Sequence, residues 1–526
     1  MNIAEVLRER ARERGDALAI VEAHRRITFA ELDRLAAAVA RELDGAGLEA
    51  GNHAFVLCPM SVALYAILIG LWRLGGVAMI VDPAAGRDHI DQCCRRSPPQ
   101  AFISVSRGHL LRLASSVVRA IPIQISIGRA LPRTRTLLVD ERARQNVDAG
   151  GSILDVSSDT AALVTFTSGS TGQPKAAVRT HAFLLAQHRV LADDLHLRAG
   201  QRDLATLPVF VLANLASGVT SVIPDADLRR PGAIAPAAVL RQVQETGVTR
   251  VAASPAFLDR LARHALGLAG YQSPLAEIYT GGAPVFPAVL RRLHAMAPAA
   301  ALVAVYGSTE AEPIARIEWR ELSAADFAHM ESGGGLLAGQ PVAAIDLRIV
   351  TDRWGEPVGP LSGEAFDAMT RRANEIGEIV VAGSHVLTGY LGGIGDSETK
   401  IHVGHRVWHR TGDAGYRDDR GRLWLLGRCS ARIGTGPDAI YPFAVECAAL
   451  TITGVERCAL VEHEGRRILA VELNRGAPAT VTELLKSRLS WATLNGIREV
   501  AAIPMDRRHN AKVDYPALEK LLQNNR

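Results

Sequence analysis

The most informative part of this chain is the stretch Leu163-Val-Thr-Phe-Thr-Ser-Gly-Ser-Thr-Gly-Gln-Pro-Lys175. An apolar, β-rich run opens it, and six small residues follow: Thr167, Ser168, Gly169, Ser170, Thr171 and Gly172. Glycines let backbone N–H groups approach an anion, hydroxyls donate further hydrogen bonds, and the closing lysine adds a point charge. We therefore predict a strand that leads into a loop able to wrap a polyphosphate, with Lys175 as a candidate catalytic residue.

The alternative is a plain Gly/Ser hairpin loop, which is the structure that such a composition usually forms. The loop is not a Walker A motif, because that motif places Gly and Lys together and here Pro174 precedes Lys175. A plain loop needs no lysine at its end, so the lysine favours the phosphate loop.

Lysine is rare in this chain, since only five of its 59 basic residues are lysines: Lys175, Lys400, Lys486, Lys512 and Lys520. This bias indicates that lysine persists where a compact ammonium is needed and a planar guanidinium does not serve. The alternative for any one of them is a surface lysine that has not been replaced. We interpret Lys175 and Lys512 as functional, because each lies in a polar turn with other chemistry-bearing residues.

Length and composition predict a soluble globular protein with two or more domains. The chain has 526 residues, of which 48% are hydrophobic and 22% charged. The formal net charge of +4 comes from interspersed charges of both signs, so no nucleic-acid partner is expected.

The cysteines and the N-terminus indicate a cytoplasmic protein. The six cysteines show neither metal-ligand spacing nor a secretory disulfide framework. The N-terminus carries acids and bases at helical spacing and lacks the apolar segment of a signal peptide. The most apolar stretch, 62–72, is interrupted by Arg73 and is too short to span a bilayer.

Strand and helix patterns alternate through the first four hundred residues, which predicts an α/β fold with largely parallel sheets. Residues 27–43 read as a helix that Thr28 and Glu31 begin with a capping box. Residues 62–74 read as a buried helix. The candidate strands are 54–57, 77–81, 101–105, 163–167, 204–207, 251–254, 277–279 and 301–305.

The pattern changes after about residue 340, where short alternating strands at 345–350, 378–381 and 423–425 predict a small β-rich subdomain. Strands near 458–462 and 468–473 and a helix at 481–489 predict a small α+β domain at the C-terminus. We place the boundary at the segment 427–432, so that the domains are 1–427 and 428–526.

Four further segments carry residues suited to binding a nucleotide. Tyr279-Thr-Gly-Gly-Ala-Pro284 is a strand that runs into a glycine turn, against which a flat ring can lie; an ordinary βα turn is the alternative. Tyr306-Gly-Ser-Thr-Glu-Ala-Glu-Pro313 offers an aromatic face, hydroxyls and carboxylates. Thr411-Gly-Asp413 places a carboxylate after a turn, and Gly427-Arg428 offers a guanidinium at the predicted boundary.

In this order the segments resemble the adenylate-forming superfamily, which includes acyl-CoA synthetases, luciferases and the adenylation domains of peptide synthetases. The matching motifs are Thr167–Lys175, Tyr306–Glu310, Gly377-Glu378 with Gly383 and Gly389-Tyr390, Thr411–Asp413, Gly427-Arg428 and Lys512. The resemblance covers nearly the whole chain and implies a mobile C-terminal domain that carries the catalytic lysine.

The resemblance implies ATP and Mg²⁺ as cofactors and gives each matching residue a role. The loop from Thr167 to Gly172, with Lys175, would hold the β and γ phosphates. Glu310 would ligate Mg²⁺, Thr309 would bind the α-phosphate, and Lys512 would bridge that phosphate and the substrate carboxylate. Adenine would lie between the Tyr306-Gly307 segment and a turn of three residues: Gly281, Gly282 and Ala283. Asp413 and Arg428 would bind the ribose.

Within the superfamily the chain is most similar to the branch that holds the olefin-pathway β-lactone synthetases. The segments that carry this similarity are 71–75, 81–83, 100–104, 407–416 and 508–512. The chain departs from the superfamily pattern at Ala176, Ser430 and Ala511. It also lacks, in 207–215, a histidine that many acyl-CoA synthetases have.

The resemblance implies attack of a substrate carboxylate, from a fatty or β-hydroxy acid, on the α-phosphorus of ATP. Pyrophosphate leaves and an acyl-adenylate remains. Closure of a β-lactone with release of AMP would follow; the alternative is transfer to the thiol of CoA or of a carrier protein. A nucleotide-binding protein without turnover is a third reading, against which the lysines and Glu310 argue.

Overall fold

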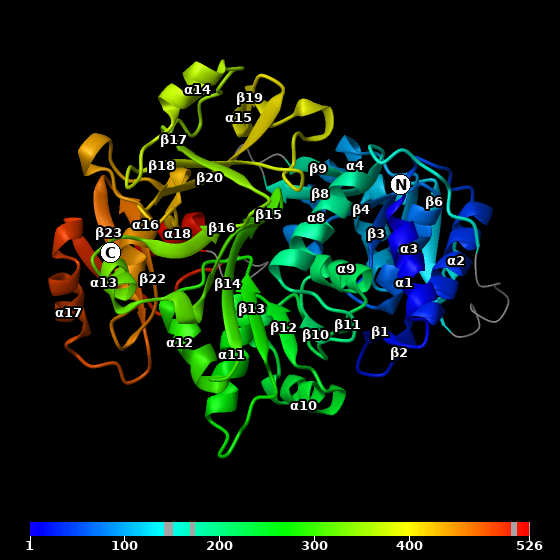
Figure 1. The fold of residues 1–526 in the computed structure, drawn as a ribbon, viewed down its shortest axis with the longest axis horizontal. Helices are drawn as coiled ribbons and strands as arrows, with labels where there is room; N and C mark the ends of the chain where they lie inside the picture. Colours follow the sequence, from blue (N-terminus) through cyan, green and yellow to red (C-terminus); the bar gives the residue numbers. More distant parts are fainter. Residues whose placement is uncertain (141–150, 169–173, 506–512, 525–526) are drawn as a thin grey trace. The chain divides into compact units, whose positions relative to one another are not determined.

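The computed structural model describes residues 1–140, 151–168, 174–505 and 513–524, which form two compact units (Figure 1). The first unit contains Met1–Ala226, Arg241–Ala252 and Gly389–Asp396. The second contains Asp227–Leu240, Ala253–Thr388 and Ser397–Arg526. The first unit is therefore built from three separate segments of the chain.

The first unit contains a seven-stranded sheet in which every neighbouring pair is parallel except the last. Its order is β7 (Arg135–Leu137), β6 (Ile123–Ile127), β5 (Ala101–Val105), β3 (His53–Leu57), β4 (Val77–Ile80), β8 (Ala161–Ser168) and β9 (Pro174–Thr180). A second run of paired strands has the order β12 (Arg250–Ala253), β10 (Arg202–Ala205), β11 (Thr220–Val222), β1 (Leu18–Val21) and β2 (Arg26–Thr28). The predicted α/β architecture with parallel sheets is confirmed here.

Helix α2 (Phe29–Gly45) begins as predicted, because the Thr28 side chain accepts from the Glu31 N–H and the Glu31 carboxylate accepts from the Thr28 N–H. Helix α3 (Val62–Arg73) is buried over nearly its whole length. Arg73 is the last residue of this helix and is also buried. Its guanidinium donates to the Asp33 carboxylate at 2.5 Å, which pairs the buried charge. Other helices described within this unit include α1 (Ile3–Glu13), α4 (Arg87–Arg96), α8 (His181–Asp194) and α9 (Pro208–Ser217).

In the sheet that contains β14 (Ala301–Ser308), parallel pairing ends at that strand, which is parallel to β13 (Glu277–Gly281) and antiparallel to β15 (Ala311–Glu318). The strands of this sheet that follow β15 all pair antiparallel: β16 (Leu336–Pro341), β21 (Leu423–Arg428), β20 (Arg406–Arg417), β18 (Gly377–Ala382) and β17 (Asp346–Val350), with β19 (Lys400–Val403) paired to β20. Flanking helices are α11 (Pro255–Leu266), α12 (Pro287–Met296), α13 (Ala324–Glu331) and α14 (Gly363–Met369). The β-rich region predicted after residue 340 is the outer part of this antiparallel sheet.

The C-terminal residues form a separate three-stranded sheet of β22 (Val455–His463), β23 (Arg466–Leu473) and β24 (Gly496–Glu499), with helices α16 (Pro442–Ala449), α17 (Val481–Arg488) and α18 (Tyr515–Asn524). Alternate side chains of β22 enter different cores: Cys458 and Leu460 pack in one cluster, Ala459 and Val461 in another. This region therefore has an α+β core on each face of its sheet. That it is a domain beginning at residue 428 stays a prediction.

Within the described ranges, no helix combines the length and the apolar character needed to cross a membrane.

Candidate active site

The predicted phosphate loop joins two paired strands of the first unit. Strands β8 and β9 form an antiparallel pair in which Thr167 faces Lys175 and Ser168 faces Pro174. The loop glycines and hydroxyls predicted to bind phosphate, Gly169, Ser170, Thr171 and Gly172, lie outside the described residues. The structure therefore describes only the residues on either side of the loop, up to Ser168 and from Pro174 onward.

Lys175 is buried against a segment that belongs to a distant part of the sequence. Its side chain is 6% exposed, and its ammonium nitrogen lies 5.7 Å from the ring centroid of Tyr390. A Cβ added to Gly395, whose φ is +98°, would come within 2.6 Å of the lysine side chain. Tyr390 also pairs with Ala177 on β9 and donates its N–H to Asp396 at 2.9 Å. The Gly389-Tyr390 motif thus begins a wall that orients Lys175.

Glycine is required where β13 ends. Gly281 faces Val305 of β14 in register, and a Cβ at Gly281 would come within 2.5 Å of the Val305 carbonyl oxygen. Gly282 follows with φ +80°, a conformation that side chains rarely adopt. Ala283 lies just beyond this turn. The predicted glycine turn is therefore present, and it brings two backbone segments close together.

Three predicted residues from separate segments meet at Asp413. The Tyr306 hydroxyl donates to Oδ2 of Asp413 at 2.7 Å, and Nη1 of Arg428 donates to Oδ1 at 2.8 Å. Asp413 and Arg428 face each other in the β20–β21 pair. Burial and then the Asp413 charge raise the pKa of Tyr306 well above its ordinary value, and the same carboxylate raises the pKa of Arg428. The cluster holds the Asp413 carboxylate between the Tyr306 phenol and the Arg428 guanidinium.

The turn before Asp413 explains its Thr-Gly sequence. The Thr411 hydroxyl donates to the Ile379 carbonyl at 2.9 Å and accepts from the Asp413 N–H at 3.0 Å. Gly412 has φ +69°, and a Cβ there would come within 2.7 Å of the Trp354 ring. Trp354 could not be predicted from the sequence, because no residue near it in the chain links it to the Thr411–Asp413 motif, which lies far away in the sequence.

A buried ion pair supports the same strand. Glu378 and Arg410 have fully buried side chains, and Nη2 of Arg410 donates to Glu378 at 2.8 Å. Arg410 also donates to the carbonyls of Arg353 and Glu356, each at 2.7 Å. Burial raises the pKa of Glu378 to about 7, although Arg410 acts to lower it. The pair fixes β18 and the loop around Arg353 to the strand that carries Asp413.

The predicted Mg²⁺ ligand, Glu310, lies with Thr309 in the turn between β14 and β15, where Ser308 faces Ala311. The Glu310 N–H donates to the Ser308 hydroxyl at 3.3 Å, and its carbonyl accepts from the Leu387 N–H at 2.7 Å. A Cβ added to Gly307, which precedes Ser308 on β14, would come within 3.1 Å of the Ala311 carbonyl oxygen. A carboxylate beside hydroxyls is a set of hard oxygen donors of the kind that Mg²⁺ prefers.

The part of the chain that the structure describes contains no group of three or more His, Cys, Asp or Glu side chains able to hold a metal ion. Mg²⁺ binds one or two carboxylates together with substrate phosphates, so a single carboxylate such as that of Glu310 is compatible with it.

The candidate residues divide between the two units. Thr167, Ser168 and Lys175 belong to the first unit, whereas the glycine turn, the Tyr306–Glu310 segment, Asp413 and Arg428 belong to the second. Lys512 lies outside the described residues.

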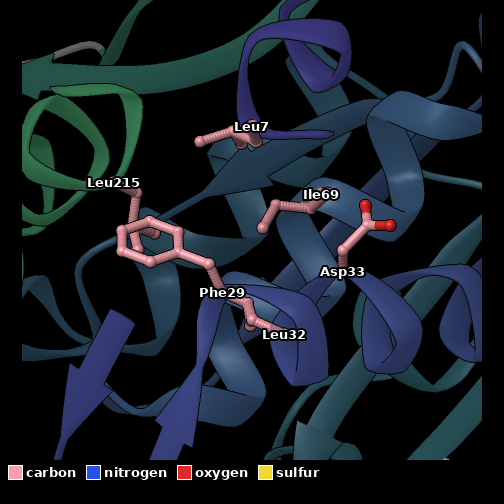
Figure 2. A pocket seen from close by; sticks show the side chains of 6 residues that line it. All are labelled: Leu7, Phe29, Leu32, Asp33, Ile69 and Leu215. Carbon is pink, nitrogen blue, oxygen red and sulfur yellow. The ribbon is translucent and has the colours of Figure 1, made fainter. Parts of the chain in front are cut away.

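Helix α9 is the segment that lacks the histidine found in many acyl-CoA synthetases. Its Asn214 donates to Asp203 at 2.7 Å, and its Leu215 lines a small cavity of about 10 Å³ together with Leu7, Phe29, Leu32, Asp33 and Ile69 (Figure 2). Such a cavity holds at most one water molecule. Asp33, its only polar lining residue, pairs with Arg73, so this cavity is a packing defect and not an acyl pocket.

Comparison with known proteins agrees with the motifs. The family model described as AMP-binding enzyme matches residues 7–391. The chain is 34% identical to an olefin beta-lactone synthetase of Stenotrophomonas maltophilia, over 97% of this chain and 96% of that protein. It is 29% identical to a feruloyl-CoA synthase of an Amycolatopsis species, over 86% of this chain and 84% of that protein.

Among solved structures, ATP-bound MatB from Rhodopseudomonas palustris superposes with a TM-score of 0.79 at 20% identity, covering 100% of this chain and 99% of MatB. That likeness establishes the fold. Because the family model covers most of the chain and a relative above 30% identity covers nearly all of it, the chain belongs to the family of AMP-binding enzymes, the adenylate-forming synthetases and ligases that its motifs resemble.

Proposed function

We propose that this enzyme activates a β-hydroxy carboxylic acid as its acyl-adenylate, with ATP and Mg²⁺, and then closes the adenylate to a β-lactone. The observation that supports the first half is the cluster at Asp413, where two other residues predicted from separate motifs, Tyr306 and Arg428, each donate a hydrogen bond to the predicted ribose-binding carboxylate. The second half is supported by the 34% identity to an olefin beta-lactone synthetase over nearly the full length.

In the proposed adenylation, the protein positions the reactants and stabilises charge. Asp413 and Arg428 bind the ribose hydroxyls, and Tyr306 with Gly307 lines one side of the adenine. The turn Gly281-Gly282-Ala283 lines the other side. The close backbone approach at Gly281 supports this role, since a side chain there would collide with β14.

The phosphates are assigned to the β8–β9 loop, Lys175 and Thr309. Mg²⁺, held by Glu310, would neutralise charge on the phosphate oxygens. The substrate carboxylate attacks the α-phosphorus, the bond to the β,γ-diphosphate breaks, and pyrophosphate leaves. Lys512 offsets the negative charge that develops during this transfer.

In the proposed closure, the β-hydroxyl oxygen of the substrate attacks the carbonyl carbon of its own adenylate. The carbon–oxygen bond to AMP breaks, AMP leaves, and the hydroxyl proton is lost to the departing phosphate or to water. Intramolecular attack needs no second substrate, which makes good placement especially effective. The missing histidine in α9 and the unusual Ser430 at the predicted boundary support a second step that differs from thiol transfer.

The competing proposal is transfer of the acyl group to the thiol of CoA or of a carrier protein. It is supported by the 29% sequence identity to a feruloyl-CoA synthase. It differs from lactone closure only after the adenylate has formed, so pyrophosphate release does not distinguish the two.

Mass spectrometry of the organic products decides between them. The protein is incubated with ATP, Mg²⁺ and a 3-hydroxy fatty acid, with and without CoA; a plain fatty acid of equal length is the matched substrate control. Closure predicts the 3-hydroxy acid minus one water, with an equal amount of AMP and no need for CoA. The plain acid should remain as bound acyl-AMP. A CoA thioester as the main product, formed only when CoA is present, would reject closure.

A further inference from the structure

Lys400 is a buried lysine in a chain that has only five. Its exposed fraction is 1%, so the surface-lysine interpretation does not apply to it. By contrast, Lys486 is exposed and pairs with Glu483 one turn away. A buried ammonium is costly unless polar groups surround it, and lysine at such a position indicates a specific use.

The Lys400 ammonium joins two elements of the second unit. It donates to the Leu387 carbonyl oxygen, and it lies 3.1 Å from Nδ1 of His409, its partner in the β19–β20 register. An ammonium only donates, so a charged Lys400 uses Nδ1 of His409 as an acceptor. Lys400 thus fixes the segment around Leu387 to β20.

The backbone N–H of Leu387 is hydrogen-bonded to Glu310, the predicted Mg²⁺ ligand. Its N–H donates to the Glu310 carbonyl at 2.7 Å, while its own carbonyl accepts from Lys400. The two preceding residues reinforce this contact. Val386 forms an antiparallel β-bridge with Ala311, and Nε2 of His385 lies 2.9 Å from the Pro313 carbonyl oxygen. The segment 385–387 therefore forms the back of the turn that presents Thr309 and Glu310.

We propose that Lys400 is a positioning residue for Glu310: it anchors Leu387, and Leu387 holds the Glu310 backbone in the orientation that presents the carboxylate to Mg²⁺. The inference rests on the proposed function, since it assumes that Glu310 meets the metal–nucleotide complex. Removal of the ammonium leaves the buried Leu387 carbonyl without this donor. The segment 385–387 is then held less firmly against the turn that carries Glu310.

The test compares Lys400→Met with Lys486→Met, which removes an exposed lysine. Three measurements are made on the full-length protein. Hydrogen exchange followed by mass spectrometry reports whether the peptide containing Leu387 becomes less protected. Mg²⁺ titration of pyrophosphate release reports the Mg²⁺ concentration for half-maximal rate, and Mg²⁺-free AMP binding by calorimetry reports the ribose side of the site.

For Lys400→Met we expect faster exchange at Leu387 and about a tenfold rise in the half-maximal Mg²⁺ concentration, the lower end of what is typical for groups behind a metal ligand. AMP affinity should stay within about twofold, because the hydrogen bonds to Asp413 do not involve Lys400. Lys486→Met should change none of these values. A general loss of structure would lower AMP binding as well, which would overturn the positioning role.

A second variant, Lys400→Gln, retains an N–H donor without the charge and keeps the test decisive if the methionine variant folds poorly. Its Mg²⁺ requirement should lie between those of the native protein and Lys400→Met. An unchanged Mg²⁺ requirement in both variants overturns the proposal. If the native protein releases no pyrophosphate with any acid, the proposed function fails; the hydrogen-exchange result still decides whether Lys400 braces Leu387.

Discussion

Asp413 accepts a protein hydrogen bond on each of its carboxylate oxygens, from Tyr306 on one side and Arg428 on the other. A carboxylate held in this way has a fixed direction, which suits a pair of neighbouring ribose hydroxyls. The Arg428 guanidinium also pairs with this carboxylate, so a nucleotide bound as proposed would gain affinity here by geometry more than by unpaired charge.

Asp413→Ala is expected to weaken ATP binding by about 2–3 kcal/mol, the usual contribution of charge-assisted hydrogen bonds that are lost together. Calorimetry with ATP measures this. Asp346→Ala serves as the control, since it removes an exposed carboxylate whose partner is Arg406. Native affinity in the Asp413 variant would show that the Thr411–Asp413 turn is purely structural.

At the scale of an element, helix α16 carries an acid that the described site does not use. Glu446 is buried, and its carboxylate accepts from the Leu460 N–H at 3.1 Å. Burial raises its pKa from the ordinary 4.5 to about 8. The folded protein therefore keeps this proton over a range in which the unfolded chain releases it.

The expected consequence is a C-terminal region whose stability falls as pH rises from about 4.5 to about 8. The sign follows because the folded state binds more protons than the unfolded state in this window. Glu446→Gln should flatten that part of the pH dependence, measured by urea unfolding at several pH values. Equal slopes in both proteins would show that Glu446 ionises without cost in the folded state.

Elements with local signals could be predicted from sequence. The Thr28–Glu31 capping box begins α2, and the eight strands predicted in the first four hundred residues are present with ends shifted by a few residues. The switch from parallel to antiparallel pairing at β14 was not predicted, because strand direction depends on how long connections cross the sheet. For the same reason the sequence did not predict Trp354, nor the contacts that Tyr390 and Lys400 make with distant residues. The rarity of lysine was the one signal that could have revealed Lys400.

At the scale of the whole molecule, the proposed reaction draws on both predicted domains. Lys512 lies in 428–526, whereas the other catalytic candidates lie in 1–427. A lysine that meets the reactants from another domain acts mainly when the reacting geometry is assembled.

Lys512→Ala should therefore lower the rate of pyrophosphate release by orders of magnitude while ATP affinity changes little, because the contact forms chiefly in the transition state. Lys520→Ala removes an exposed lysine eight positions later in the sequence and should leave the rate unchanged. Steady-state kinetics together with ATP calorimetry provide the measurement. Undiminished turnover would remove Lys512 from the mechanism.

The wall beside Lys175 has a consequence for recombining this enzyme with its relatives. The eight residues Gly389–Asp396 belong to the first unit, although the chain on either side of them belongs to the second. A chimera that imports a foreign β8–β9 hairpin would pair its lysine with a Tyr390 and a Gly395 that evolved for another sequence. Crossover points chosen by linear position would break this match, so the hairpin and the segment 389–396 need to be inherited as one cassette.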